Sequence, residues 1–147
     1  MSVGEQAVAL GLADSSINTV DQFVRRGLKN LKTFSIVDGK LDGDLLDKHQ
    51  LSCYELAFCT AELAAAREVC VYARKVGDDD SLATDAALGF SSEAVTSALQ
   101  RLLARATDLG LDVVELSALF DDSAISVLRA QYGSAEFLAG IGSAVAD

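Results

Sequence analysis

The chain contains no proline and no tryptophan, and aromatic residues make up only 6% of its 147 residues. Proline removes a backbone donor and breaks helix interiors, so its absence permits long uninterrupted helices. Because half of the chain is apolar and little of it is aromatic, its core must consist mainly of Leu, Val, Ile and Ala. A chain of this length can bury such a core in one domain. These features predict a single all-α domain over residues 1–147.

Basic residues are scarce: 12 Lys and Arg stand against 22 Asp and Glu, giving a formal net charge of -10. A nucleic-acid backbone would repel such a surface, so no nucleic-acid partner is predicted. Anionic membranes are poor partners for the same reason, and no apolar run approaches the roughly 20 residues that span a bilayer. The first residues lack a basic region followed by an apolar one, so we expect no secretory signal and a cytoplasmic location.

Residue types suited to metal or nucleophilic chemistry are few. The cysteines Cys53, Cys59 and Cys70 contain no CxxC pair, and we interpret them as small apolar residues rather than a disulfide or zinc set. His49 is the only histidine, and no GxSxG or phosphate-binding glycine motif accompanies it, so neither a triad nor a nucleotide site is predicted. The segment Asp38–Asp44 fails as a calcium loop because a lysine occupies its third position.

Apolar residues recur at alternating steps of three and four along three long stretches, which is the spacing of amphipathic helices. We predict helices over about Val3–Leu31, Asp44–Val76 and Leu82–Leu109, separated by turn-forming segments. Gly77 is placed to end the second helix, and the acidic run Asp78–Asp80 suits the start of the third. The predicted inward-facing residues are Leu10, Ala13, Ile17, Val20, Val24 and Leu28, then Leu56, Cys59, Leu63, Ala66, Cys70 and Ala73, then Val95, Leu99, Leu102, Ala106 and Leu109.

Shorter helices are predicted to follow Gly110. One covers about Val113–Phe120, and the next begins near Asp122 and is broken at Tyr132-Gly133-Ser134. Ser134 can cap a last amphipathic segment that runs to about residue 145. Three long helices with short C-terminal ones predict an antiparallel up-and-down bundle.

Five segments along the chain resemble parts of the C-terminal helical domain of acyl-CoA dehydrogenases. The segment Asp47–Ala57 is the most specific, because it matches a Gln-containing helix start followed by an aliphatic Leu-Ala pair. Phe34 precedes it in a stretch similar to the family's Arg-x-x-Phe segment. The other similar segments are Val3–Ala13, Ser92–Val95 and Tyr132–Phe137. The resemblance implies the bundle fold of that one domain.

The resemblance also implies roles for individual residues. Its flavin-side residues are Phe34, Gln50, Ser134 and Glu136. Leu31 occupies the position of the arginine that reaches the FAD pyrophosphate, and Asp108 adds a negative charge where the family's glycine pair approaches it. Tyr132 stands where most members carry the catalytic base, and the alternative base position falls near Met1, which is not a carboxylate. We therefore expect no dehydrogenation by this chain alone, and FAD only together with a partner chain.

Three hypotheses follow for function. The first is a dehydrogenase-like helical subunit that associates with itself, or with a chain that binds flavin and acyl-CoA. In the second hypothesis the flavin-side residues Phe34, Gln50, Ser134 and Glu136 complete an active site shared with such a partner. The third is an unrelated all-α scaffold or regulatory interaction protein without flavin. The association hypothesis predicts exposed apolar side chains, and its candidates are Phe34, Ile36, Leu45, Phe58, Phe90 and Phe137.

Overall fold

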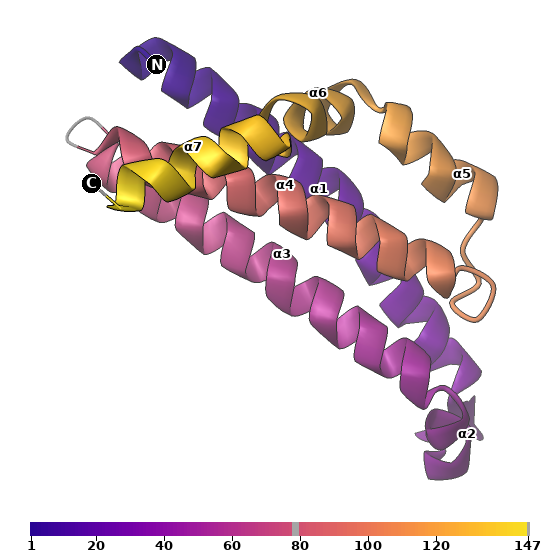
Figure 1. Cartoon of the computed structure of the whole chain (residues 1–147). Helices are drawn as coiled ribbons and strands as arrows, with labels where there is room; N and C mark the ends of the chain where they lie inside the picture. Colours follow the sequence, from indigo (N-terminus) through magenta and orange to yellow (C-terminus); the bar gives the residue numbers. More distant parts are fainter. Residues whose placement is uncertain (78–79, 147) are drawn as a thin grey trace.

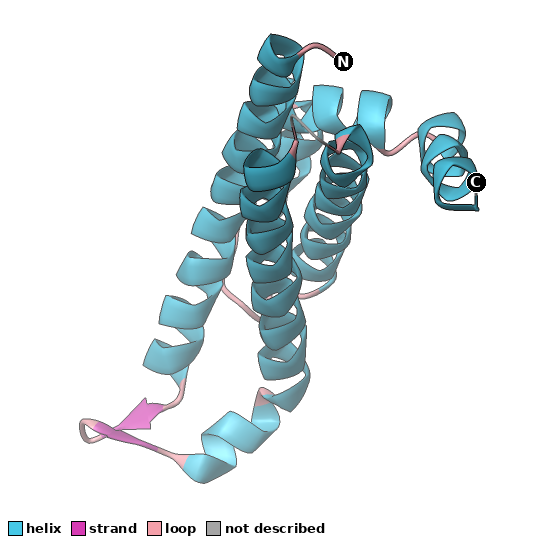
Figure 2. Cartoon of the chain, turned by 90° about the vertical axis from the view of Figure 1, so that its left-hand side faces the viewer, coloured by secondary structure: helices cyan, strands magenta, loops and turns pink. Residues whose placement is uncertain are grey.

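The computed structural model describes residues 1–77 and 80–146, which are almost entirely helical, as the all-α prediction requires. The elements in chain order are α1 (Val3–Phe34), β1 (Ile36–Val37), β2 (Lys40–Leu41), α2 (Gly43–Lys48), α3 (Gln50–Val76), α4 (Ser81–Ala104), α5 (Val113–Ala118), the 3₁₀ turn η1 (Leu119–Asp121), α6 (Ser123–Tyr132) and α7 (Ala135–Ala146). The three long helices α1, α3 and α4 lie beside one another and alternate in direction: in the view of Figure 1, α1 runs down, α3 up and α4 down. Figure 2 shows the hairpin and α2 at one end of this bundle.

The core lies between α1, α3 and α4, and the shorter α6 packs on α1 and α4. All the predicted inward-facing residues of the second and third helices are buried. In α1 the prediction fails only at Leu28, which is 44% exposed, whereas Gly27 and Leu31 face inward. The buried residues keep the alternation of three and four steps through Val24, Gly27 and Leu31. Leu28 leaves this series because it follows Val24 by four residues where the alternation requires three.

The structure corrects the helix predicted over Asp44–Val76, which is divided into α2 and α3. Its beginning is earlier, because the Asp42 side chain accepts a hydrogen bond of 2.9 Å from the Leu45 backbone N–H and caps α2. The chain then leaves the helix at His49, whose φ of -101° and ψ of 15° separate α2 from α3. The His49 ring packs against Phe34, with 6.2 Å between ring centroids. No capping side chain marks this break, so no local pattern predicts it.

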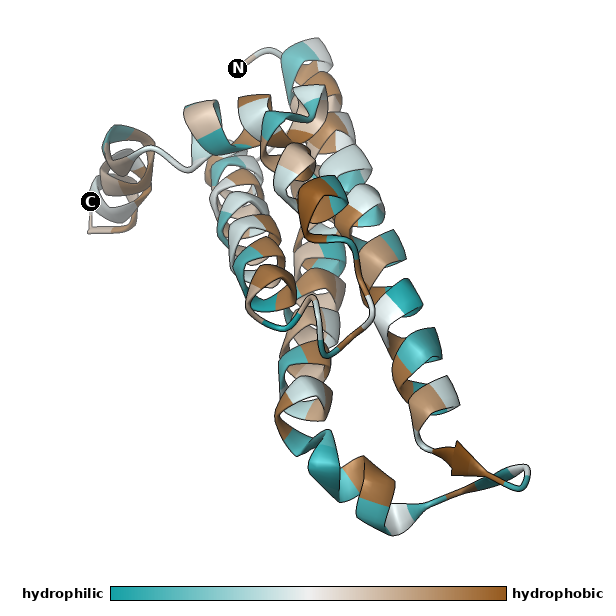
Figure 3. Cartoon of the chain, turned by 90° about the vertical axis from the view of Figure 1, so that its right-hand side faces the viewer, coloured by the Kyte–Doolittle hydropathy of each residue, from teal (hydrophilic) through white to brown (hydrophobic). Residues whose placement is uncertain are grey.

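The connection after α1 was predicted as turns, and part of it forms a small β-hairpin. Ile36 pairs with Leu41, and Val37 pairs with Lys40. Asp38 and Gly39 between the strands have positive φ angles of 48° and 77°. An Asp-Gly pair with both φ positive is the favoured two-residue hairpin turn, which explains why the strands form here. The apolar residues of β1 remain exposed at this end of the bundle, where Figure 3 shows the arrow in brown.

The third helix ends at Ala104, five residues before the predicted Leu109. Residues 105–110 form a separate turn in which the Leu111 N–H donates to Ala106 O at 2.8 Å and the Gly110 N–H donates to Thr107 O at 3.1 Å. This bond pair with Gly110 at φ 60° is a Schellman ending, so Gly110 stops the segment as predicted. At the start of α4, the Asp80 side chain accepts a hydrogen bond from the Ala83 N–H, as expected for an acidic residue at a helix start. The other two residues of the predicted acidic run, 78 and 79, lie outside the described residues.

The C-terminal prediction is confirmed in outline. Asp122 caps α6, which ends before Gly133, and Ser134 Oγ accepts a hydrogen bond of 3.2 Å from the Phe137 N–H. A Cβ at Gly133 would lie 2.5 Å from Ser92 Oγ, so a larger residue cannot pass this close to α4. Gly133 therefore lets the chain turn against α4 and start α7, which carries half-buried side chains but no fully buried one.

Candidate functional sites

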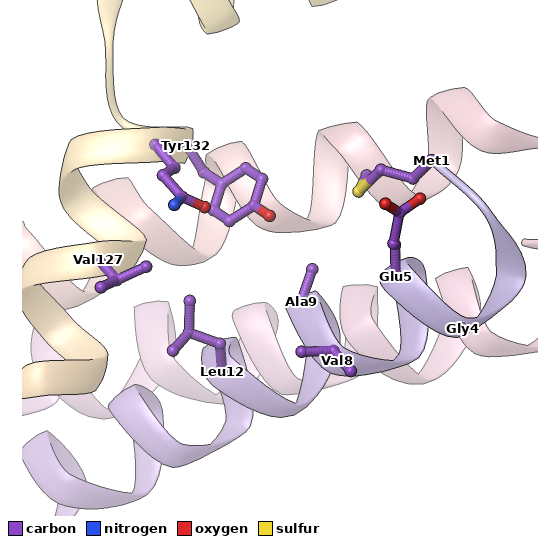
Figure 4. A pocket seen from close by; sticks show the side chains of 9 residues that line it. Met1, Gly4, Glu5, Val8, Ala9, Leu12, Val127 and Tyr132 are labelled. Atoms are coloured by element: carbon purple, nitrogen blue, oxygen red, sulfur yellow. The ribbon is translucent and has the colours of Figure 1, made fainter.

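An apolar pocket of about 630 Å³ lies between the N-terminal half of α1 and the C-terminal half of α6. Its residues come from both helices and are Met1, Gly4, Glu5, Val8, Ala9, Leu12, Val127, Gln131 and Tyr132. Figure 4 shows the Tyr132 ring extending from α6 toward the first turn of α1, where Glu5 and Met1 lie. The volume falls in the range of about 300–1,000 Å³ that small-molecule sites occupy. The pocket can therefore hold an apolar group of moderate size.

Two polar groups in this pocket differ in charge. Hydrogen bonds from Ser2, whose backbone N–H lies 2.7 Å from Glu5 Oε2, lower the pKa of Glu5 and keep its carboxylate ionised. Burial raises the pKa of the Tyr132 phenol, and the negative charges of Asp85 and Glu5 raise it further. At neutral pH the pocket therefore offers one fixed negative charge and one neutral phenol. Because most of the other lining residues are apolar, this combination suits an apolar or neutral ligand.

The two positions that the dehydrogenase resemblance assigns to a catalytic base, Tyr132 and Met1, line this same pocket. Neither is a carboxylate. Glu5 is the carboxylate that the pocket does contain, but it is engaged in the capping box of α1. A general base works best when its pKa is raised toward the operating pH, and the pKa of Glu5 is shifted the other way. The pocket lining therefore includes a carboxylate, Glu5, whose pKa is lowered rather than raised toward neutrality.

The four residues that the resemblance assigns to the flavin do not lie together within one chain. Phe34 ends α1 and Gln50 begins α3, both at the hairpin end of the bundle, and both are exposed. Ser134 and Glu136 lie at the start of α7 in the other half of the bundle (Figure 1). The Ser134 hydroxyl is already used to cap α7. A flavin that used all four residues would have to take the two pairs from different chains.

The second candidate site is an exposed face of α3. Seven residues form what we call the outer stripe: Leu51, Tyr54, Phe58, Ala61, Ala65, Glu68 and Tyr72. Leu51 is 63% exposed, Tyr54 and Tyr72 are each 56% exposed, and the other members are exposed as well. The steps between them alternate between three and four, which is the spacing of the contact positions in a coiled coil. In the structure α3 packs against α1 and α4 through its opposite face.

Contacts with α4 hold the centre of the outer stripe in place. The Arg101 guanidinium lies over the Phe58 ring at 4.7 Å from its centroid, and Arg101 Nη1 donates to Glu55 Oε2 at 2.6 Å. The Tyr54 ring lies against Phe58, with 4.7 Å between centroids. An open hollow of about 330 Å³ is lined only by Tyr54, Ala57, Phe58 and Ala61. Such a fixed apolar hollow can receive a side chain from another molecule.

The sequence prediction found only part of this surface. Of the six predicted exposed candidates, Phe34, Ile36, Phe58 and Phe90 are exposed, whereas Leu45 and Phe137 are half-buried. The outer stripe was missed except for Phe58, although its heptad spacing is readable in the sequence. The signal that could have found it is a second apolar repeat on a helix whose first repeat already fills the core.

Other features set the chemistry that these sites can use. Cys59 and Cys70 are buried, as predicted, Cys53 is half-buried, and all three thiols are free. Within residues 1–77 and 80–146, no group of His, Cys, Asp or Glu side chains is arranged to hold a metal ion. No helix in the described part of the chain is long and apolar enough to cross a membrane. Comparisons with protein-family models, curated proteins and solved structures find no match to this chain.

Proposed function

We propose that this chain is a helical subunit that acts by association with another protein chain. The observation that carries the proposal is the outer stripe of α3, on which six of seven residues are apolar or aromatic and all are exposed. A contiguous apolar face of this kind on a soluble domain typically marks a site of protein contact. Covering the stripe would remove from water side chains as large as Leu51, Tyr54 and Tyr72.

The dehydrogenase resemblance supplies the finer part of this proposal, in which the subunit is non-catalytic by itself. Two observations support it. The residue in place of the pyrophosphate-binding arginine, Leu31, is buried in the core, and the pocket carboxylate Glu5 has a lowered pKa. A chain with neither a phosphate-binding cation at that position nor a base could contribute shape and contact surface to an acyl-CoA dehydrogenase-like assembly, while a partner supplied FAD and chemistry.

The test of association uses the purified full chain. Sedimentation velocity over a range of protein concentrations should show an assembly larger than a monomer, and a hydrophobic dye should bind under conditions that favour the monomer. A chain that stays monomeric at millimolar concentration and binds no dye would refute the proposal. The dye measurement matters because it detects an available apolar face even where the correct partner is missing.

A second candidate function is a shared flavin active site, and one observation favours it. Met1 and Tyr132, which the resemblance assigns to the two alternative base positions, line one pocket although they are far apart in the chain. The test is to isolate the chain with its native partners and record visible absorption. A flavin spectrum that a Val127→Arg substitution in the pocket diminishes, with the complex still intact, would support this function. A colourless complex would exclude it.

A further inference from the structure

We propose that the outer stripe of α3 binds the same stripe of a second copy, antiparallel, about a two-fold axis that passes between residues 59 and 60. The inference rests on the proposed function and names the partner in it. A symmetric dimer uses one surface patch twice, so the patch must be complementary to itself. The residues of the stripe can be examined for that property directly.

The geometry of the stripe suits a facing helix. The stripe runs from Leu51 to Tyr72, a length of about 33 Å at the usual rise per residue. The hollow lined by Tyr54, Ala57, Phe58 and Ala61 has the spacing i, i+3, i+4, i+7. In helix pairs with this heptad spacing, four residues of one helix form the hole that accepts one side chain of the other. The exposed face therefore already has the shape of half of a helix–helix contact.

Side-chain sizes match in the antiparallel arrangement. With the axis between residues 59 and 60, Phe58 faces Ala61 of the second copy, and Tyr54 faces its Ala65. Each large ring thus meets a small residue, and the symmetry repeats both contacts. A parallel pair would instead place each residue against itself, so that the two Phe58 rings would collide where the two Ala65 residues leave a gap. Alternation of large and small residues across facing positions is what lets two surfaces interdigitate.

Charge favours the same orientation. Glu68 is the only charged residue of the outer stripe, and a parallel pair would bring the two Glu68 carboxylates face to face, which is destabilising. In the antiparallel pair each Glu68 faces Leu51 of the second copy, and the two carboxylates are about 25 Å apart along the helix axis. Glu55, which borders the stripe, is already neutralised within its own chain by Arg101 at 2.6 Å.

The size of the contact sets the expected affinity. The paired part of the stripe, from Leu51 to Glu68, is about 27 Å long and about 10 Å wide, because Tyr72 lies beyond the end of the facing α3. This area is smaller than the roughly 800 Å² per partner of a standard interface. We therefore expect a dimer with a dissociation constant in the micromolar range. Each copy carries a formal charge of -10, so added salt should screen the repulsion between copies and tighten the dimer.

Cysteine cross-linking tests the orientation. The background is the full chain with Cys53, Cys59 and Cys70 changed to Ala, checked for native helicity by circular dichroism. In that background, Leu51→Cys and Glu68→Cys should each fail to form a disulfide alone and should form one when the two variants are mixed under oxidation. A Gln22→Cys variant, at an exposed position of α1, mixed with Glu68→Cys gives the rate of chance collisions. A parallel pair would give the reverse result, with each single variant cross-linking to itself.

A substitution at the centre of the stripe tests the surface. Ala61→Arg lies at an exposed position with little effect expected on folding, and Gln22→Arg adds the same charge elsewhere. Sedimentation equilibrium should show dimerisation at least about 30-fold weaker for Ala61→Arg than for Gln22→Arg, as for the loss of a central contact. Equal dimerisation of the two variants would overturn the inference. A monomeric wild-type chain that still binds dye would overturn the second copy as partner and leave the association proposal standing, whereas a monomer without dye binding would overturn both.

Discussion

The inner and outer stripes of α3 have the same seven-residue repeat and opposite surroundings. The inner stripe consists of Ser52, Leu56, Cys59, Leu63, Ala66, Cys70 and Ala73, and every member is buried between α1 and α4. The outer stripe has the same alternation of three and four, yet every member is exposed. Periodicity therefore identifies a face that can pack, but it does not say whether anything in the same chain covers that face.

The two stripes differ in the kinds of residue they contain. The inner stripe has no aromatic and no charged residue, whereas the outer stripe has three rings and Glu68. A tyrosine ring with its hydroxyl tolerates partial contact with water better than an aliphatic side chain does, and it also provides contact area at an interface. Composition thus separates a stripe made for the interior from one that must be stable both exposed and covered.

The largest expected effect comes from breaking the inner stripe. Leu63 is fully buried, so Leu63→Ala should lower the free energy of unfolding by about 2–5 kcal/mol, from lost burial and the cavity left behind. Leu51→Ala removes the same atoms from the outer stripe and should cost under about 0.5 kcal/mol in the monomer. Urea denaturation at low protein concentration measures both values. Equal losses of stability for the two variants would mean that α3 is covered on both sides, so that the inner and outer stripes do not differ as described.

Local patterns predicted much of the fold. Stripes, glycine stops and the Ser134 cap are properties of neighbouring residues, and these predictions are confirmed except at Leu28. The break at His49 was missed because no capping side chain marks it and because His49 contacts Phe34, which lies in another segment. The early end of α4 was missed because Ala106 and Leu109, in the turn that follows, are buried as a longer helix would place them. The pocket between α1 and α6 was missed as well. Its residues, such as Val8 and Val127, carry no motif and become a site only when the two helices meet.

The next effect concerns the inner-stripe thiol of Cys59. Burial raises its pKa from 9.0 to about 12. Between these pH values the folded state keeps the thiol proton while the unfolded state loses it, so the stability that this group contributes is complete below pH 9 and is lost as pH rises toward 12. One such group can add a slope of at most about 1.4 kcal/mol per pH unit.

Urea unfolding between about pH 8 and about pH 10 (one unit either side of the unfolded thiol pKa of 9.0) isolates this contribution. The wild-type chain should lose stability with rising pH more steeply than Cys59→Ala, whereas Cys53→Ala, at a half-buried position, serves as the matched control. The comparison uses slopes because Cys59→Ala also changes packing at all pH values. Identical slopes for wild type and Cys59→Ala would show that the inner stripe admits water near this thiol.

A smaller effect is expected where charged groups border the covered side of α3. Asp21 accepts hydrogen bonds from Arg25 at 2.8 Å and from Arg67 of α3 at 3.0 Å. Burial alone raises the pKa of Asp21, but the hydrogen bonds and charges of the two arginines outweigh it, so its pKa lies below the ordinary 3.8. Its contribution is therefore present above pH 3.8 and is lost as the pH falls through the lowered value.

Asp21→Asn should cost about 1–2 kcal/mol at pH 7 and flatten the acid limb of the stability curve. The matched control is Glu115→Gln, which breaks the pair with Arg26, where both side chains are about half exposed. Surface pairs are worth about 0–1 kcal/mol, so the control should change stability less than Asp21→Asn does. Chemical denaturation from about pH 2.5 to about pH 7, an interval that includes the ordinary aspartate pKa of about 3.9, measures the free energy of unfolding of both variants. A larger loss of stability for Glu115→Gln than for Asp21→Asn would contradict the prediction that the less exposed Asp21 contributes more than the half-exposed Arg26–Glu115 pair.

The smallest effect in the monomer should become the most concentration-dependent one. Ala61→Arg replaces one good helix former with another at an exposed site, so its monomer stability should differ from wild type by under about 0.5 kcal/mol. Self-association stabilises the folded state by mass action, because only folded chains present the outer stripe. The wild-type melting temperature should therefore rise with protein concentration, and that of Ala61→Arg should stay constant. The same concentration dependence of the melting temperature in both proteins would mean that copies of this chain do not cover the outer stripe. Only a different partner could then cover the outer side of α3, as α1 and α4 cover its inner side.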